Sequence, residues 1–239
     1  VRLVTGVGRF TEMNYILQIL KENDQFEFLL GIGTDKISGL KIALLEFCKK
    51  QYPDDKELFV LIAHHFRLYN EIAVMWETEA NSVIRDLIRD TRRENIRAIS
   101  MNQMVKLAKT ENTEKRLQCA MTNYTHATDY YLRDNKLNLA NRCCHQAQLV
   151  ALQVSLLNAV GQNQQVACLL NLGTEEINKV IIQGLSFPQA MMLVQSYNYS
   201  GDWSSAIYHH VVIGGETKYL KDFMGSMRLT SAIVQDCVC

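Results

Sequence analysis

The side chains of this sequence that are best suited to chemistry are histidines and cysteines in three short groups. His64-His65, His209-His210 and Cys143-Cys144-His145 offer imidazole and thiolate groups, which are ligands that zinc prefers. Neighbouring residues of a helix point about 100° apart, so none of these groups can hold an ion without further ligands from elsewhere in the chain. Because one residue of each group also falls on an apolar stripe, the sequence favours packed core residues over a metal site.

Other short motifs give no stronger indication of a site. Gly6-Val7-Gly8 and Gly31-Ile32-Gly33 do not follow a strand and do not lead to a Lys-Ser or Lys-Thr pair, so we interpret them as turns that end helices. We interpret Cys237-Val238-Cys239 as the start of a helix. The chain has no GxSxG elbow and no HExxH pair. The prediction is a protein that is not an enzyme, with no catalytic, cofactor-binding or metal-binding residue; an active site assembled from distant residues is the alternative.

Composition limits the partners of the chain. Its 239 residues are 48% hydrophobic, enough for one core or a continuous helical seam, and 25 Lys and Arg balance 25 Asp and Glu. This balance provides no basic field for nucleic acid. No apolar run approaches the roughly 20 residues of a membrane-spanning helix, and no signal peptide is recognisable. Seven cysteines without paired spacing predict reduced thiols and a cytoplasmic location, and the start in mid-pattern at Val1 indicates a piece of a longer protein.

The elements that would position these side chains are amphipathic helices, and no stretch between Gly161 and Met224 alternates like a strand. Ser186 is predicted to cap a helix that has a proline in its first turn and ends at 198–201. Asp202 is predicted to cap the next helix, which Gly214-Gly215 ends. A third helix follows with the apolar stripe Tyr219, Leu220, Phe223 and Met224.

The first half of the chain predicts longer helices. One is capped by Thr11, another ends at Pro53, and Asp54 with Glu57 forms a capping box for a single helix of about five turns or more that continues to Trp76. Dense charge at 85–94 and polar residues at 109–116 indicate exposed turns or helix ends. A further long helix covers 139–157. The predicted buried stripes are Met13, Ile16, Leu17 and Leu20; Phe26, Phe28, Leu29 and Leu30; Leu40, Ala43, Leu44, Phe47 and Cys48; and Leu58, Leu61, Ile62, His65, Tyr69, Ile72 and Trp76.

These stripes predict an all-α fold, an irregular α-solenoid of stacked antiparallel helical hairpins. Residues 1–239 are expected to form a single helical segment with a polar break near 85–116, and no strict repeat length recurs. Helical arrays of this kind present surfaces to protein partners. Trp203 and Tyr208 are conceivable anchors for a partner, although packing of Trp203 against the neighbouring hairpin is the favoured interpretation.

Several stretches carry a specific resemblance. They are the segments 5–17, 26–30 and 40–46, followed by Gly161-Gln-Asn, Leu170-Asn-Leu-Gly173, Phe187 with Gln189-Ala190, Asp202-Trp203 and Tyr219-Leu-Lys-Asp-Phe223. In order and spacing they resemble the C-terminal region of the spatacsin family, of which the chain would be a fragment. The resemblance spans most of the chain and is poor between about Val83 and Arg116.

The resemblance implies a large, helical, non-enzymatic scaffold on the cytosolic face of lysosomes and late endosomes. It implies spastizin and the fifth adaptor-protein complex as partners, membrane association through those partners, and a role in lysosome reformation from autolysosomes and in axon maintenance. No family motif assigns the contacting residues, so the partner-binding residues stay unknown. Two alternatives stand beside it: an intramolecular brace within a larger helical protein, and an enzyme with a site assembled from distant residues.

Overall fold

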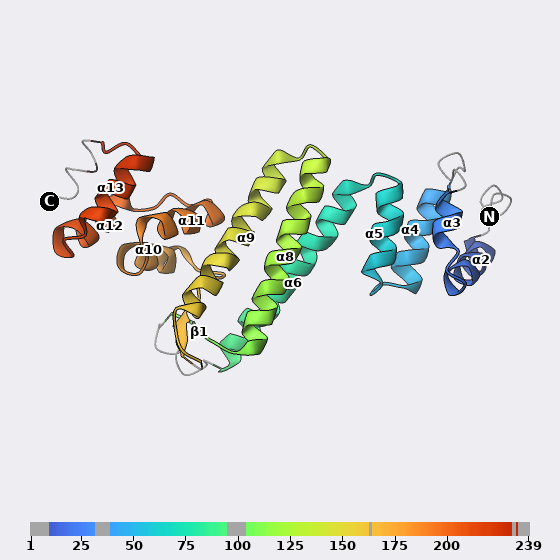
Figure 1. Ribbon diagram of the computed structural model, residues 1–239, viewed down its shortest axis with the longest axis horizontal. Coiled ribbons are helices and arrows are strands. Elements are labelled where there is room, and N and C mark those ends of the chain that lie inside the picture. Colours follow the sequence, from blue (N-terminus) through green and yellow to red (C-terminus); the bar gives the residue numbers. More distant parts are fainter. Residues whose placement is uncertain (1–9, 32–38, 95–103, 163, 231–232, 234–239) are drawn as a thin grey trace. The chain divides into compact units, whose positions relative to one another are not determined.

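The computed structural model describes residues 10–31, 39–94, 104–162, 164–230 and 233. They form the helices labelled α2 to α13 and one two-stranded ladder, so the predicted all-α class is confirmed (Figure 1). By their contacts the residues divide into two compact units, Val1–Met75 with Asp129–Lys136, and Trp76–Thr128 with Leu137–Cys239. The stacking of hairpins into a solenoid stays a prediction.

The first unit buries the apolar stripes of four helices in one core. The helices are α2 (Phe10–Glu22), α3 (Phe26–Gly31), α4 (Leu40–Gln51) and α5 (Lys56–His65). Most of the predicted stripe residues are buried here, including Met13, Leu17, Phe47 and Ile62. Phe28 is the exception, at 66% exposed. It lies two residues from the buried Phe26, which on a helix places it on nearly the opposite side.

The predicted single helix from Asp54 to Trp76 is wrong, because the chain forms two helices. α5 ends at His65 and α6 (Tyr69–Glu94) begins after a turn in which Arg67 has a φ of 54°. The backbone N–H of Leu68 donates to the carbonyl of Ala63 over 2.8 Å, and that of Arg67 donates to His64. This pair of bonds is a Schellman closure, which satisfies the last carbonyls of α5.

Two predicted N-caps in this half are also wrong. Asp55, not Asp54, caps α5, because its carboxylate accepts a hydrogen bond of 2.9 Å from the N–H of Leu58. The same carboxylate forms an ion pair with Lys21 of α2. α2 begins at Phe10, so Thr11 lies inside the helix and does not cap it.

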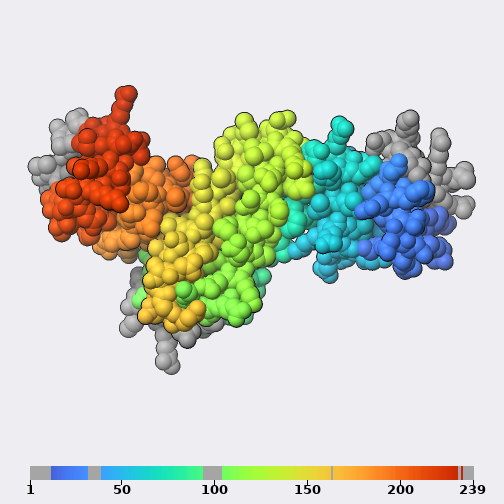
Figure 2. Space-filling view, viewed as in Figure 1, coloured from blue at the N-terminus to red at the C-terminus, as the bar shows by residue number. Residues whose placement is uncertain are grey.

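The second unit contains α6 from Trp76 onward, most of α8 (Glu111–Arg133), all of α9 (Leu137–Asn158) and a set of short helices. α6 is accompanied by α8 and α9, and the side chains of α8 and α9 fill the space between their ribbons (Figures 1 and 2). The charged stretch 85–94 forms the C-terminal turns of α6 and 109–116 spans the start of α8, so both lie at helix ends as predicted. The short elements are α10 (Thr174–Gln183), α11 (Phe187–Tyr197), α12 (Trp203–Ile207), the π-helical η2 (Tyr208–Ile213) and α13 (Thr217–Ser226).

The predicted caps of the short helices are confirmed. Ser186 is the N-cap of α11, whose C-cap Asn198 is left-handed. Asp202 caps α12 and accepts a hydrogen bond of 3.1 Å from the N–H of Ser205. Gly215 has a φ of 68° after η2. These ends could be predicted because each cap bonds to groups only a few residues away; the N–H of Ser186, for example, donates to Gln189 Oε1 over 3.1 Å.

An aromatic cluster joins the short helices. The ring of Phe187 lies 5.4 Å from Trp203, 5.7 Å from Tyr219 and 5.4 Å from Phe223, measured between centroids. These contacts connect α11, α12 and α13. Met224, predicted on the same stripe, is 59% exposed, because α13 turns by about 100° between Phe223 and the next residue.

The prediction that residues 161–224 contain no strand is wrong at one place. β2 (Gln165–Ala167) pairs antiparallel with β1 (Lys106–Ala108), with Leu107 opposite Val166. Three residues are too few to show the alternation by which a strand is recognised in sequence.

The outer edge of β2 is closed by one buried side chain. The ladder bonds from Lys109 to Gln164 and from Cys168 to Val105 place Ala167 at a position whose carbonyl points away from β1. Gln153 of α9, which is 0% exposed, donates from Nε2 to this carbonyl over 3.2 Å. Its Oε1 accepts from the N–H of Leu169 over 2.6 Å. A single amide thus takes the place of a neighbouring strand.

Candidate functional site

The histidine and cysteine groups lie in packed surroundings. The ring of His65 contacts Phe66, with centroids 4.9 Å apart, and His210 stacks on Tyr219 at 4.3 Å. Cys143 is buried, and burial raises the pKa of its thiol to about 12. In the part of the chain that the structure describes, no three His, Cys, Asp or Glu side chains are placed to hold a metal ion.

Other predicted positions fall partly outside the described residues. Gly6-Val7-Gly8, Ile32-Gly33 and Cys237–Cys239 lie outside them, and Gly31 is the last residue of α3. Of the two conceivable anchors, Trp203 is 9% exposed and packs against Phe187. Tyr208, in η2, is 44% exposed.

A pocket of about 990 Å³ lies within the second unit, where α6, α8 and α9 face the segment after β2 and the end of α11. We call it the arginine pocket. Its lining residues are Thr78, Asn81, Ile84, Arg85, Ile88, Arg89, Arg92, Arg93, Tyr124, Gln146, Leu149, Val150, Leu170, Asn171 and Tyr197.

Four arginines of α6 line one side of this pocket. Arg85, Arg89, Arg92 and Arg93 follow the spacing i, i+4, i+7 and i+8, which places them along one face of a helix. All four are exposed. The lining residues include no aspartate or glutamate, so the pocket carries an excess of positive charge.

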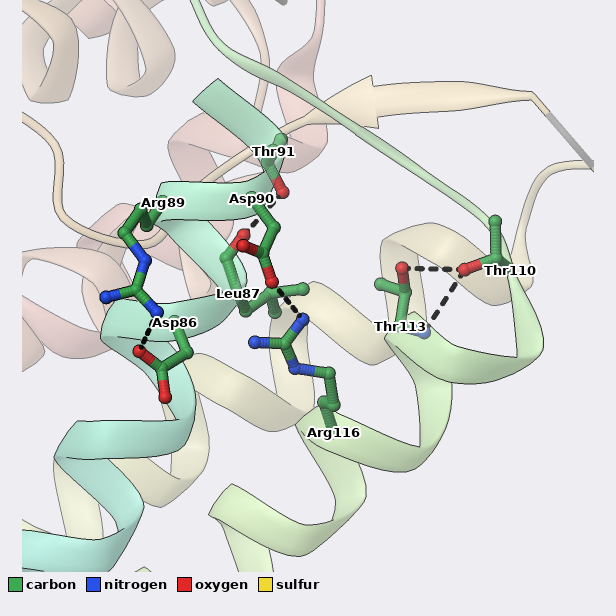
Figure 3. Close-up of polar contacts among 8 residues, drawn as sticks. All are labelled: Asp86, Leu87, Arg89, Asp90, Thr91, Thr110, Thr113 and Arg116. Atoms are coloured by element: carbon green, nitrogen blue, oxygen red, sulfur yellow. Dashed lines mark hydrogen bonds and ion pairs between the residues drawn. The ribbon is translucent and has the colours of Figure 1, made fainter. Parts of the chain in front are cut away.

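The two aspartates in this stretch of α6 are each paired with an arginine (Figure 3). Asp86 pairs with Arg89 over 2.7 Å. Asp90 points to the other side of α6, towards Arg116 of α8, and the two groups are 2.9 Å apart. This hydrogen bond holds the pKa of the Asp90 carboxyl below its usual value.

The start of α8 fixes the position of Arg116. The N–H of Thr113 donates to the hydroxyl of Thr110 over 3.1 Å, which caps the helix two turns before the arginine (Figure 3). Asp90 pairs with Arg116, and within the described residues no ion pair joins Arg92 or Arg93 to a carboxylate.

The floor of the pocket is mainly apolar. Ile84, Ile88, Leu149, Val150 and Leu170 supply aliphatic surface. Between them lie two tyrosines whose hydroxyls are hydrogen-bonded within the protein.

Both hydroxyls are held in the neutral form. Tyr124 donates to Asn81 Oδ1 over 2.7 Å, and Tyr197 donates to the carbonyl of Leu169 over 2.7 Å. Burial raises the pKa of both phenols, that of Tyr197 to about 12. The described lining therefore offers guanidinium donors, apolar surface, the Thr78 hydroxyl and the amides of Asn81, Gln146 and Asn171. This arrangement can bind an anionic partner that also has apolar side chains.

The arginine pocket was not predicted from the sequence. The four arginines stand in the stretch 85–94, which was interpreted as an exposed, charged helix end. Their i, i+4, i+7 spacing was the available signal. It did not show that Asp90, which stands among them, pairs with Arg116 of α8.

The fold and the pocket define an all-α protein with a cationic binding pocket over an apolar floor. The family model described as Spatacsin C-terminus matches residues 1–239. The chain belongs to this family, which confirms the resemblance seen in the sequence.

Two relatives show how much of a longer protein the chain represents. It is 29% identical to mouse spatacsin over 236 residues, which cover 99% of the chain and 9% of the mouse protein. It is 23% identical to a Dictyostelium discoideum protein over 244 residues, covering 100% of the chain and 6% of that protein. No solved structure matches the chain. None of the described helices has the length and apolarity required to cross a bilayer.

Proposed function

We propose that the chain is a non-enzymatic scaffold segment that binds partner proteins in endolysosomal membrane trafficking, with the arginine pocket as a contact site. The observation that carries the proposal is the pocket itself, whose lining includes four arginines and no carboxylate. Membership of the spatacsin family supports the trafficking role.

The proposed partners follow from the family. They are spastizin and the fifth adaptor-protein complex, bound at the cytosolic face of late endosomes and lysosomes. There the longer protein would support lysosome reformation from autolysosomes and, in neurons, axon maintenance. Membrane association would then occur through these partners.

The mechanism would be contact without catalysis. Arginines that surround a desolvated apolar centre are frequent sources of binding energy in protein interfaces. Exposed guanidinium groups also attract an acidic partner over a distance of about one Debye length, roughly 8–10 Å at physiological ionic strength. Binding at the arginine pocket should therefore weaken as salt concentration rises.

The test is a quantitative pull-down of spastizin from cytosol by the affinity-tagged chain. The double variant Arg92→Glu/Arg93→Glu should retain at least about tenfold less spastizin, equivalent to 1.4 kcal/mol. The matched control is Lys49→Glu/Lys50→Glu, which makes the same charge change in the last turn of α4. If the folded wild-type chain retains no spastizin, the proposal is overturned.

A second candidate is the intramolecular brace. The chain covers 9% of mouse spatacsin, so the remaining length could supply its contacts. In that case the remainder of the longer protein, added in trans, should bind the chain and spastizin should not. The two results assign the contact to different proteins.

A further inference from the structure

The unpaired charge of the arginine pocket is concentrated at the end of α6. Arg89 is paired with Asp86, and Arg85 donates from Nε to the carbonyl of Asn81 over 3.3 Å. Within the described residues, no ion pair joins Arg92 or Arg93 to a carboxylate, although the Arg93 charge also helps to lower the pKa of Asp90. Both are exposed, so their guanidinium groups can meet an incoming ligand. An occupant that supplies carboxylates would form charge-assisted, bidentate hydrogen bonds with them.

The floor requires a second property of the occupant. Leu149, Val150, Leu170 and Ile88 are largely buried, but their surfaces still line the pocket. Because the tyrosine hydroxyls are bonded internally, the floor offers few free polar groups to a ligand. A small inorganic anion or a lipid headgroup would use the arginines and leave this floor unused. A peptide with both acidic and apolar side chains would use both parts.

The spacing of the arginines indicates the conformation of that peptide. Arg85 and Arg92 are separated along α6 by about 10.5 Å, at 1.5 Å per residue. Acidic side chains at i, i+4 and i+7 of a second helix aligned with α6 would repeat the spacing of Arg85, Arg89 and Arg92. The acidic side chain nearest the end of α6 would meet Arg92 and Arg93, and apolar side chains beside the acidic ones would face the floor. Helix-in-groove binding of this kind is a recurring mode of recognition.

We infer that the arginine pocket binds an acidic amphipathic helix of a partner protein, whose carboxylates pair with Arg92 and Arg93 while its apolar side chains cover the aliphatic floor. The inference rests on the proposed function and specifies the chemistry of the partner. It does not depend on which protein carries the helix.

Fluorescence anisotropy with a designed helix tests the inference directly. The probe is a fluorescein-labelled 18-residue helical peptide with Glu at i, i+4 and i+7 and Leu at the following positions, and the control peptide replaces each Glu by Lys. The Glu peptide should bind the chain and the Lys peptide should not. Arg92→Glu/Arg93→Glu should weaken binding by at least tenfold, and Lys49→Glu/Lys50→Glu should leave it unchanged. Circular dichroism checks that both double variants are folded.

A substitution in the floor of the pocket distinguishes binding of the peptide from binding of an anion that contacts the arginines alone. Ile84 is only half-buried, so Ile84→Ser can be made without emptying the core. Ile84→Ser should reduce the affinity of the chain for the Glu peptide by about threefold or more, and it should leave any binding of phosphatidylserine vesicles unchanged. Arg92-dependent vesicle binding without peptide binding would overturn the inference in favour of a lipid headgroup. Equal binding of the Glu peptide to wild type and to the Arg92→Glu/Arg93→Glu variant would overturn it as well.

The two proposals fail in different ways. If spastizin is retained but neither the peptide nor the pull-down depends on Arg92 and Arg93, the scaffold function stands and the acidic helix is wrong. If the peptide binds as expected but spastizin is not retained, the pocket chemistry is right and the assigned partner is wrong.

Discussion

Replacing Gln153 by leucine should remove the hydrogen bonds that hold the outer edge of β2 and the residues after it to α9. The wild-type amide bonds to the carbonyl of Ala167 and to the N–H of Leu169 while fully buried. Leucine has a similar size and can make neither bond. The segment that follows, which includes Leu170 of the arginine pocket, would lose its connection to α9.

The expected magnitude follows from the two groups left behind. Each buried backbone group without a hydrogen bond costs about 1–3 kcal/mol, which gives about 2–6 kcal/mol for the pair. Burying an aliphatic side chain in place of the amide offsets about 1.5–3 kcal/mol of this. We expect a net loss of about 2 kcal/mol in the free energy of unfolding, or roughly 1 M in the urea midpoint.

Urea denaturation followed by circular dichroism measures this loss, and hydrogen exchange at the Leu169 amide locates it. Gln148→Leu is the matched control, because Gln148 is exposed on the same helix and should change the free energy of unfolding by no more than about 0.5 kcal/mol. In the Gln153→Leu variant the Leu169 amide should exchange at least about tenfold faster than in wild type.

A second substitution sharpens the test. Gln153→Glu keeps an acceptor for the Leu169 N–H, but its carboxylate faces the carbonyl of Ala167 and is buried. Burial raises the pKa of such a carboxyl, and its protonated form can donate as glutamine does. The loss in the free energy of unfolding of the Gln153→Glu variant, relative to wild type, should therefore become smaller as pH falls. The reasoning is refuted if Gln153→Leu and Gln148→Leu unfold at the same urea concentration with the Leu169 amide equally protected.

Three further perturbations test other parts of the fold. Phe187→Ala should cost about 3–5 kcal/mol because the ring packs against three others, whereas Phe28→Ala, at a side chain 66% exposed, should cost less than about 0.5 kcal/mol; equal urea midpoints would contradict the burial of the cluster. Asp55→Ala should cost about 1 kcal/mol at pH 7 through the lost cap of α5. The bond to Lys21 and the cap bond lower the pKa of the Asp55 carboxyl. Thermal melts should therefore show the full destabilisation of the Asp55→Ala variant above about pH 4, and the difference from wild type should shrink as pH falls further. Cys119, which is exposed, should react with iodoacetamide before the buried Cys143, whose thiol has a raised pKa; peptide mass spectrometry would detect the reverse order.

The features that the sequence predicted correctly are local ones. Ser186 and Asp202 could be identified as caps because their partners lie three residues away. The buried stripes of α2 and α4 could be identified because burial follows the period of the helix.

The break between α5 and α6 could not be identified in this way. Apolar residues continue at helical spacing through the turn, and the left-handed position is filled by Arg67, not by the glycine that usually marks such an end. Asp24, Asn135 and Asn198 fill similar positions elsewhere in the chain. Each of these helix ends is formed by backbone hydrogen bonds between residues up to five positions apart. The type of residue at the left-handed position does not by itself indicate such bonds.

The arginine pocket depends on tertiary contacts. The sequence contains alternating charges along 85–94, and that pattern is typical of a solvated helix face. The Asp90 carboxylate accepts a hydrogen bond from Arg116, which lies 26 residues later in the chain and on the other side of α6. Among the described residues this distant pairing engages the one aspartate that stands between Arg89 and Arg92, and the aliphatic floor contributed by α6, α9 and Leu170 completes the site.

The β1–β2 ladder also sets an order of events during synthesis. Lys106 pairs with Ala167, 61 residues later in the chain. At about 5–20 residues per second, β1 leaves the ribosome roughly 3–12 s before its partner exists. The hairpin of α8 and α9, built from local contacts, can form within microseconds to milliseconds and so precedes the ladder. Slower translation across 109–164 would lengthen the time for which β1 has no strand partner. During that time a chaperone that binds short extended segments could bind β1.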